Sequence, residues 1–407
     1  MTELTIRLTG MAHGGLAIGR DKDGRAIFVP FALPGETVRV RMTQDRQRFA
    51  RAELIEVVKP AGDRTPPRCR HFGICGLCHF QHMTYEAQLR TKETVARDQL
   101  TRVGGIQNPA LRPIVPHPQT YEYRGDCTLF IVETGGLGYW SPGQRRIFPV
   151  EACPILRPRL QELLTDLDID LPELRKLTMR LGDDDEVLVA LEIEDVEPPE
   201  LAVDFPVSVA IVLPDRTAAA LIGDPFLSVA IKNRHFQISP GVAFPSSSTA
   251  AEMITDAVIE LAGLKQQDTI LEVNGESGWL TAALSENCDA VLALEPNPDA
   301  VADLVRNLDD MANISVFEGT EESVLAELEQ RPDAAIFHHG RNLSPAALNW
   351  LSRQRPERLI LCSEVGIQAK DAKRLAMLGY GLQTAIPLDT QPQTYQIELV
   401  SVWIYRR

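Results

Sequence analysis

The sequence predicts a multidomain protein with a small, OB-like β-barrel at the N-terminus, a mixed α+β domain in the middle and an α/β Rossmann-like domain at the C-terminus. The chain has 407 residues, which is two to three times the length of an ordinary domain. Residues 1–60 hold short strand-like runs, whereas helices and strands alternate from about residue 240. We expect domains at 1–60, 61–238 and 239–407.

The first domain is expected to be all-β. Its strand-like runs are 4–10, 25–31, 36–42 and 51–58, and turn residues such as Gly, Pro and Asp separate them. Strands this short and this closely spaced favour a closed barrel, because closure removes exposed strand edges. Residues 59–62, with sequence KPAG, form a plausible boundary.

The middle domain combines one clear helix with several strands. The helical pattern covers residues 84–103, and apolar runs at 185–195 and 207–214 predict strands. Residues 172–181 have a mixed pattern. We expect an α+β fold that also carries a cysteine motif.

The last domain alternates between the two kinds of element, which predicts a mostly parallel sheet covered by helices on both faces. Ligands of such sheets bind at the carboxyl ends of the strands. The predicted helices are 249–264, 278–287, 299–311, 323–330, 344–353 and 369–380. The predicted strands are 268–273, 290–295, 314–319, 333–339, 358–362 and 396–405.

Composition and charge narrow the function. No apolar run approaches 18 residues and the first residues lack a basic-then-apolar segment, so we expect a cytoplasmic protein without a membrane partner. The net charge is −15, but residues 1–160 hold 23 Lys+Arg against 15 Asp+Glu, or +8, which leaves −23 for the remainder. This asymmetry favours a polyanion, such as RNA, as a partner of the N-terminal half.

Three cysteines form a motif in the middle domain. Cys69, Cys75 and Cys78 have the spacing C-x5-C-x2-C, and Cys153 lies far downstream. Thiolates are soft ligands that suit zinc or an iron–sulfur cluster. Zinc ligands usually come as two close pairs, so a trio with one distant cysteine favours a four-iron (4Fe-4S) cluster. Three nearby histidines keep a Cys/His zinc site as an alternative: His71, His79 and His82.

A second motif follows the predicted strand 268–273. Gly275 and Gly278 form a turn in front of a helix, and Glu295 ends the next strand 23 residues after Glu272. An acidic residue at that place commonly binds the hydroxyls of a ribose. This layout is that of an S-adenosylmethionine site, although Glu276 stands where a glycine would be usual.

Taken together, these motifs resemble the bacterial RNA (uracil-5-)-methyltransferases over nearly the full length of the chain. Residues 28–38 are similar to the family's RNA-binding barrel, the TRAM domain. The other matching positions are Cys69, Cys75, Cys78, Gln81 and His82 of the iron–sulfur motif, Tyr123, Arg124 and Cys153 of the central domain, His235 to Phe244 at the entry to the class I methyltransferase domain, and Asp389 to Glu398 near the C-terminus.

The resemblance implies a reaction in which a cysteine adds to C6 of uracil and a glutamate removes the C5 proton. The target base must leave its stack to be reached. Glu398 matches the base. Cys362 lies one residue before the family's cysteine position, which Ser363 occupies, and a shift of one residue on a strand turns a side chain to the other face.

Several cofactor-pocket positions depart from the family pattern. His338, His339 and Gly340 replace most of an Asp-Pro-Pro-Arg turn, so His338 is the candidate contact there. Pro245 replaces a glutamine that follows Phe244, and Gln396 replaces a histidine. Phe244 remains a candidate cofactor contact.

The departures leave two functions open. The first is an S-adenosylmethionine-dependent RNA uracil-C5 methyltransferase that acts on rRNA or tRNA. The second is a non-catalytic paralogue that binds structured RNA, for example as an rRNA folding or assembly factor. In both, the N-terminal half contacts RNA and no DNA partner is expected. A third interpretation keeps the cofactor but changes the chemistry.

Overall fold

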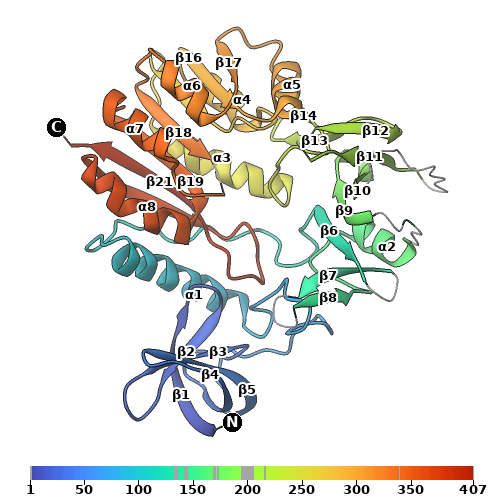
Figure 1. Cartoon of the computed structure of the whole chain (residues 1–407), viewed down its shortest axis with the longest axis vertical. Helices are drawn as coiled ribbons and strands as arrows, with labels where there is room; N and C mark the ends of the chain where they lie inside the picture. The colour runs from blue at the N-terminus through green and yellow to red at the C-terminus, as the bar shows by residue number, and fades with distance from the viewer. Residues whose placement is uncertain are drawn as a thin grey trace.

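The computed structural model describes residues 2–132, 136–141, 145–167, 171, 174–193, 206–214, 217–338 and 340–406. A barrel, a middle region built mainly of strands and a C-terminal α/β body follow one another along the chain (Figure 1). Helix α1 lies between the barrel and the C-terminal body (Figure 1). No helix in the described ranges is long and apolar enough to cross a membrane.

The N-terminal region is a closed five-stranded barrel, as the sequence predicts. Alternate residues of its strands are buried, because a closed sheet has one face toward its core. The strands are β1 (Glu3–Ala12), β2 (Leu16–Arg20), β3 (Ala26–Pro30), β4 (Thr37–Asp45) and β5 (Phe49–Lys59), in the order β1-β2-β3-β5-β4. The fully buried Glu36 carboxylate accepts from the Arg64 guanidinium at 2.5 Å and thereby ties the barrel to the following segment.

The middle region contains a seven-stranded sheet in the order β12-β11-β10-β9-β6-β7-β8. The predicted helix at 84–103 is α1 (Tyr85–Asp98) followed by a π-helical turn (Gln99–Val103), and the mixed pattern at 172–181 is strand β9 (Leu174–Leu181). The remaining elements are β6 (Asp126–Ile131), β7 (Leu137–Ser141), β8 (Arg146–Pro149), α2 (Pro158–Asp166), a 3₁₀ turn (Asp183–Asp185), β10 (Val187–Ile193), β11 (Ser208–Val212), β12 (Ala218–Ile222), and the hairpin β13 (Leu227–Ile231) and β14 (Arg234–Ile238).

The C-terminal body is a second seven-stranded sheet, ordered β17-β16-β15-β18-β19-β21-β20. Its strands are β15 (Thr269–Val273), β16 (Ala290–Glu295), β17 (Ile314–Glu318), β18 (Ala334–His338), β19 (Arg358–Glu364), β20 (Tyr380–Leu388) and β21 (Glu398–Tyr405). Its helices are α3 (Ser248–Ala262), α4 (Trp279–Ser285), α5 (Pro298–Asn307), α6 (Glu321–Glu327), α7 (Pro345–Gln354) and α8 (Val365–Met377). The first five strands in sequence are parallel, and β21 runs antiparallel between β19 and β20.

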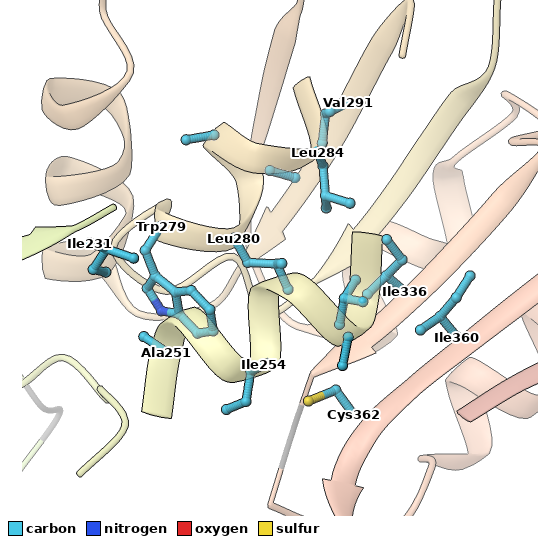
Figure 2. Close-up of a cluster of buried hydrophobic side chains, with 14 of the residues drawn as sticks. Ile231, Ala251, Ile254, Trp279, Leu280, Leu284, Val291, Ile336, Ile360 and Cys362 are labelled. Carbon is cyan, nitrogen blue, oxygen red and sulfur yellow. The ribbon is translucent and has the colours of Figure 1, made fainter. Parts of the chain in front are cut away.

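The strand order reverses between β15 and β18, which places the expected ligand crevice at their carboxyl ends. One face of the sheet packs under α3 and α4, and Figure 2 shows Trp279, Leu280 and Cys362 among the side chains of this cluster. A separate cluster joins the barrel core to α1 and to β21 through Leu399. The barrel is therefore packed directly against the elements that form the crevice.

Candidate active site

The turn after β15 has the form that the sequence predicts. Asn274 and Glu276 adopt left-handed backbone conformations, with φ of 66° and 50°, and Gly278 has a φ of 87°. A Cβ added to Gly275 would lie 2.7 Å from Leu304 Cδ1 of α5. Gly275 therefore allows the turn to pack against α5, and this packing is one physical reason for a glycine at that position.

Glu295, the expected ribose ligand, lies at the end of β16 and is almost fully buried. Its two carboxylate oxygens accept from the backbone N–H groups of Glu276 at 2.8 Å and Asn297 at 2.9 Å. Burial raises the pKa of Glu295 above its usual range, while these two hydrogen bonds act in the opposite direction. The carboxylate thus fixes the β15–α4 turn against the start of α5.

Two adjoining pockets open at this end of the sheet. The first, which we call the cofactor pocket, has a volume of about 340 Å³. Its lining residues are Gly241, Val242, Ala243, Asn274, Glu276, Glu295, Asn297, Ala300, His338, Gly340 and Arg341. Candidate residues Glu295 and His338 both line it, whereas the candidate glycines Gly275 and Gly278 are not among its lining residues.

The second, which we call the base pocket, has a volume of about 290 Å³. Its lining residues are Ala243, Phe244, Pro245, Ser246, Ala250, Ile254, Glu276, His338, Gly340, Ser363, Glu364, Ile367, Thr390, Gln391 and Glu398. Both pockets are lined by Ala243, Glu276, His338 and Gly340, so the polar side chains of Glu276 and His338 stand at their junction. Phe244, a predicted cofactor contact, lines the base pocket instead, while the exposed Gln396 lines neither.

The two candidate catalytic residues lie in contact. Strand β19 continues through Glu364, so Cys362 is a strand residue and pairs with Val400 of β21. Since side chains alternate along a strand, Cys362 and Glu398 point to the same face of the sheet, whereas Ser363 points to the other. The Cys362 Sγ lies 3.6 Å from Glu398 Oε1, to which the thiol donates.

Both groups have perturbed acidities. Burial raises the pKa of the Cys362 thiol well above its usual range, and the neighbouring Glu398 adds to the effect. Burial also raises the pKa of Glu398 to about 7. The Cys362 side chain is fully buried in the apolar cluster beneath α3, while Glu398 lines the base pocket. The thiol is therefore protonated at rest, with a carboxylate beside it that can accept a proton near neutral pH.

His338 ends β18, next to Cys362 in the parallel pairing of β18 with β19. Burial lowers the pKa of His338 to about 4, so the imidazole is neutral at physiological pH. Its Nδ1 lies 4.0 Å from Glu276 Oε1, and its backbone carbonyl accepts from Asn274 Nδ2 at 2.9 Å. His339, named with it in the sequence, lies outside the described residues.

The four candidate metal cysteines lie near one another in the middle region. Cys75, Cys78 and Cys153 are buried in one apolar cluster, and Cys69 is partly exposed. Burial raises the pKa of Cys78, and negative charge on the other three thiols raises it further, which reflects their proximity. Within the described ranges, no group of three or more His, Cys, Asp and Glu side chains is arranged to hold a metal ion.

The sequence did not predict the contacts that fix the loop before β21 to helix α1. Lys92 and Asp389 form a fully buried ion pair with Nζ and Oδ1 2.5 Å apart. Gln88 donates to the Gln393 side chain and accepts from the Gln393 backbone, each at 3.0 Å. These contacts join α1 to the loop that leads to Glu398. No local sequence signal identifies them, because the partners of the ion pair are 297 residues apart.

The barrel also reaches the site. His13, just after β1, lies 2.7 Å from the Glu364 carboxylate through its Nε2. Glu364 lines the base pocket and pairs with Glu398 across β19 and β21. A side chain of the N-terminal barrel therefore contacts a wall of the candidate active site.

Comparisons with known proteins find a TRAM domain and relatives that are named RNA methyltransferases. Residues 2–55 match the TRAM domain family. An uncharacterized RNA methyltransferase of Synechocystis is 28% identical over 98% of this chain and 94% of its own length. A 23S rRNA (uracil(1939)-C(5))-methyltransferase, RlmD, of Alkalilimnicola ehrlichii is 26% identical over 98% of this chain and 96% of its own.

A solved structure has the same fold over the whole chain. It is the tRNA (uracil-54, C5)-methyltransferase of Pyrococcus abyssi in complex with S-adenosyl-L-homocysteine. The TM-score is 0.73 at 21% sequence identity, and the match covers 99% of this chain and all of that one. The order of barrel, middle region and α/β body is thus shared with a protein that binds a methyl-transfer product.

Proposed function

We propose that this chain, which belongs to the bacterial RNA (uracil-5-)-methyltransferase family, methylates C5 of a uridine in a structured ribosomal or transfer RNA. The observation that carries the proposal is the 3.6 Å contact between the Cys362 thiol and the Glu398 carboxylate beside the base pocket. C5 of uracil is a weak nucleophile. The reaction therefore needs a thiol that adds to C6 and a base that removes the C5 proton.

In this proposal Cys362 is the nucleophile and Glu398 is the base. As the Sγ–C6 bond forms, the thiol proton passes to Glu398 Oε1 and leaves through the base pocket. C5, made nucleophilic by this addition, then accepts the methyl group from the donor. The same carboxylate takes the proton from C5, elimination breaks the Sγ–C6 bond, and Glu398 passes its proton to the departing sulfur. The raised pKa of Glu398, about 7, suits both transfers because a base is most effective when its pKa lies near the working pH.

S-adenosylmethionine is the proposed methyl donor, and when bound it supplies an electrophilic methyl group on a positively charged sulfonium. The cofactor pocket fits such a molecule in three respects. It adjoins the base pocket, it lies at the carboxyl ends of the parallel strands, and it contains the Glu295 carboxylate. Asn274, Asn297 and Arg341 add polar side chains to its wall.

We also propose that Cys69, Cys75, Cys78 and Cys153 hold a four-iron cluster. The chemistry of the donor set supports this, because thiolates are soft ligands that suit iron–sulfur clusters, and because Cys69, Cys75 and Cys153 lie near enough to Cys78 to add to the effect of burial on its pKa. The spacing favours the cluster over zinc, because zinc ligands usually come as two close pairs, whereas here a close trio is joined by one distant cysteine.

The barrel and the middle region are the proposed RNA-binding surface. The positive charge of residues 1–160 supports this assignment. Part of that charge is neutralised within the barrel, since Arg41 pairs with Glu3 and Glu53, and Arg39 pairs with Glu56. We expect the remaining arginines to make most of the phosphate contacts, with binding that weakens as salt is raised.

One observation favours a second candidate function, a non-catalytic RNA-binding protein. The Cys362 side chain is fully buried and does not line the base pocket, so it must be uncovered before it can reach C6 of a uracil. In this alternative the α/β body supports the RNA-binding surface without transferring a methyl group.

The test is transfer of tritiated methyl groups from S-adenosylmethionine to unmodified 23S rRNA and tRNA transcripts, followed by nucleoside analysis. We expect 5-methyluridine with the wild type and with Cys288→Ala, which removes another buried thiol of the same apolar cluster. We expect none with Cys362→Ala or Glu398→Gln. Full activity of Cys362→Ala would refute the proposed chemistry. Salt-sensitive RNA binding without methylation of either RNA would favour the second candidate.

A further inference from the structure

The carboxylate of Glu276 stands at the junction of the two pockets, on the turn between β15 and α4, where its backbone conformation is unfavourable. Glu276 has a φ of 50°, a left-handed conformation that disfavours a residue with a Cβ by about 1–2 kcal/mol. Glycine would avoid this cost. A glutamate at a position that favours glycine therefore suggests that its side chain has a function.

The Glu276 carboxylate is held in place from two sides. Its Oε2 accepts from Trp279 Nε1 at 3.0 Å, and its Oε1 lies 4.0 Å from the neutral His338 imidazole. The side chain is 16% exposed, and that exposure is toward the pockets that it lines. A partly desolvated carboxyl group of fixed position, which a bound cation would ionise, thus stands where the cofactor pocket meets the base pocket.

The surroundings of Glu276 make this junction favourable for a cation. The base pocket contains the carboxylates of Glu276, Glu364 and Glu398, and no lysine or arginine stands among the described residues that line it. In the cofactor pocket the one lining cation, Arg341, is paired with Glu321 at 2.7 Å. Arg180 is the positive group that acts on Glu276 from outside these linings.

We propose that the Glu276 carboxylate binds the positively charged sulfonium end of S-adenosylmethionine and thereby selects the charged methyl donor over the uncharged thioether product. This inference rests on the proposed function and adds a specificity-determining residue to it. The donor and the product, S-adenosylhomocysteine, differ at the reacting sulfur by one methyl group and one positive charge. A carboxylate at the junction attracts the first and gains nothing from the second.

In this proposal Glu276 takes the place of a carboxylate that the family pattern has elsewhere in the pocket. His338 stands where the family pattern has an aspartate, so that carboxylate is absent from the end of β18. Glu276 supplies a carboxylate from the facing turn, next to the same histidine. Selection of the charged donor also favours release of the product after each methyl transfer.

The experiment measures affinities of the full-length protein for S-adenosylmethionine, S-adenosylhomocysteine and sinefungin by calorimetry. Sinefungin carries a protonated amine in place of the sulfonium. We expect the wild type to bind the two cationic ligands at least tenfold more tightly than S-adenosylhomocysteine. Glu276→Gln keeps the shape and should remove about tenfold of that preference, because it removes the Coulomb attraction between the carboxylate and the cation in a partly desolvated site.

Glu286→Gln, at the exposed C-terminal end of α4, is the matched control and should leave all three affinities unchanged. Equal binding of the three ligands by the wild type, or an unchanged preference in Glu276→Gln, would overturn the inference and leave the proposed function standing. If neither S-adenosylmethionine nor S-adenosylhomocysteine bound the wild type at millimolar concentration, the proposed function and the inference would fail together.

A second readout is the release of a proton when the ligand binds. Burial raises the pKa of Glu276 to about 7, and a cation placed beside it would lower that pKa. Binding of S-adenosylmethionine at pH 6.5 should therefore release a proton that binding of S-adenosylhomocysteine does not. Titrations in buffers of different ionisation heats measure this release. Glu398, Glu295 and Glu272 also titrate nearby, so the proton release due to Glu276 is the difference between the wild type and Glu276→Gln. Equal proton release by the two proteins would contradict the proposal.

Discussion

Glu272, on the strand beneath the cofactor pocket, provides a quantitative test of the electrostatic interpretation. Its side chain is fully buried, and neither carboxylate oxygen has a hydrogen-bond partner among the residues that the structure describes. Burial raises its pKa to about 8; Glu276 and Glu295 add to this increase, and the Thr281 hydroxyl opposes it. The folded protein therefore keeps a proton on Glu272 at neutral pH, whereas the unfolded chain loses it near the ordinary value of 4.5.

The direction of the pH dependence follows from this difference. Between pH 4.5 and 8 the folded state binds more protons at this site than the unfolded state, so stability falls as the pH rises through that range. At pH 7 the proton that Glu272 must hold in the folded state lowers the free energy of unfolding by about 3 kcal/mol. Glu272→Gln has nearly the same shape and no charge. We therefore expect it to be more stable than the wild type by about that amount at pH 7.

The assay is urea unfolding at pH 5, 7 and 8.5, followed by the fluorescence of the buried tryptophans of the C-terminal body. We expect the stability gain of Glu272→Gln to be small at pH 5 and to increase with pH. Glu286→Gln, an exposed site on α4, should show no gain at any of the three values. A gain that is the same at every pH, or a loss at pH 8.5, would refute the argument.

Three further predictions concern the active site and its supports. Lys92→Met leaves Asp389 buried without its partner, so the free energy of unfolding, measured by urea denaturation, should fall by about 3–5 kcal/mol. Adding Asp389→Asn to Lys92→Met should recover part of this loss. If the double variant instead lost the sum of the two single-variant losses, the pairing would be contradicted. The single-turnover rate of methyl transfer should rise with pH through about 7, because Glu398 must be ionised to act as a base; a rate independent of pH from 5.5 to 8 would argue against that role. Cys78→Ser should reduce bound iron and visible absorbance but leave the affinity for S-adenosylmethionine unchanged, and an unchanged iron content would rule Cys78 out as a ligand.

Much of the fold could be predicted from the sequence because its patterns are local. The barrel has alternating apolar residues in short runs, and α3 has a helical period with Ser247 as its N-cap. Strand β9 was ambiguous because its charged residues interrupt the apolar pattern, and β20 had no predicted counterpart. Both strands acquire their structure from neighbours that are distant in sequence.

The candidate site could be predicted less completely, because its geometry depends on register and on distant partners. The sequence left open whether Cys362 reaches the nucleophile position: the pairing of β19 with β21 places it on the same sheet face as Glu398, whereas Ser363 is the one of the two that lines the base pocket. The cysteine motif was visible from spacing alone. The role of Lys92 could not be predicted from the sequence, because a lysine on a helix is expected at the surface unless its buried partner is known.

The central claim is that Cys362 attacks C6 of a uridine, and trapping with 5-fluorouridine RNA tests it most directly. Fluorine at C5 cannot be removed as a proton by Glu398, so the covalent adduct should accumulate once the methyl group has been transferred. We predict a protein–RNA adduct that depends on S-adenosylmethionine, with mass spectrometry placing the modification on Cys362. The absence of an adduct on any RNA that the protein methylates, or an adduct on a different cysteine, would contradict the account.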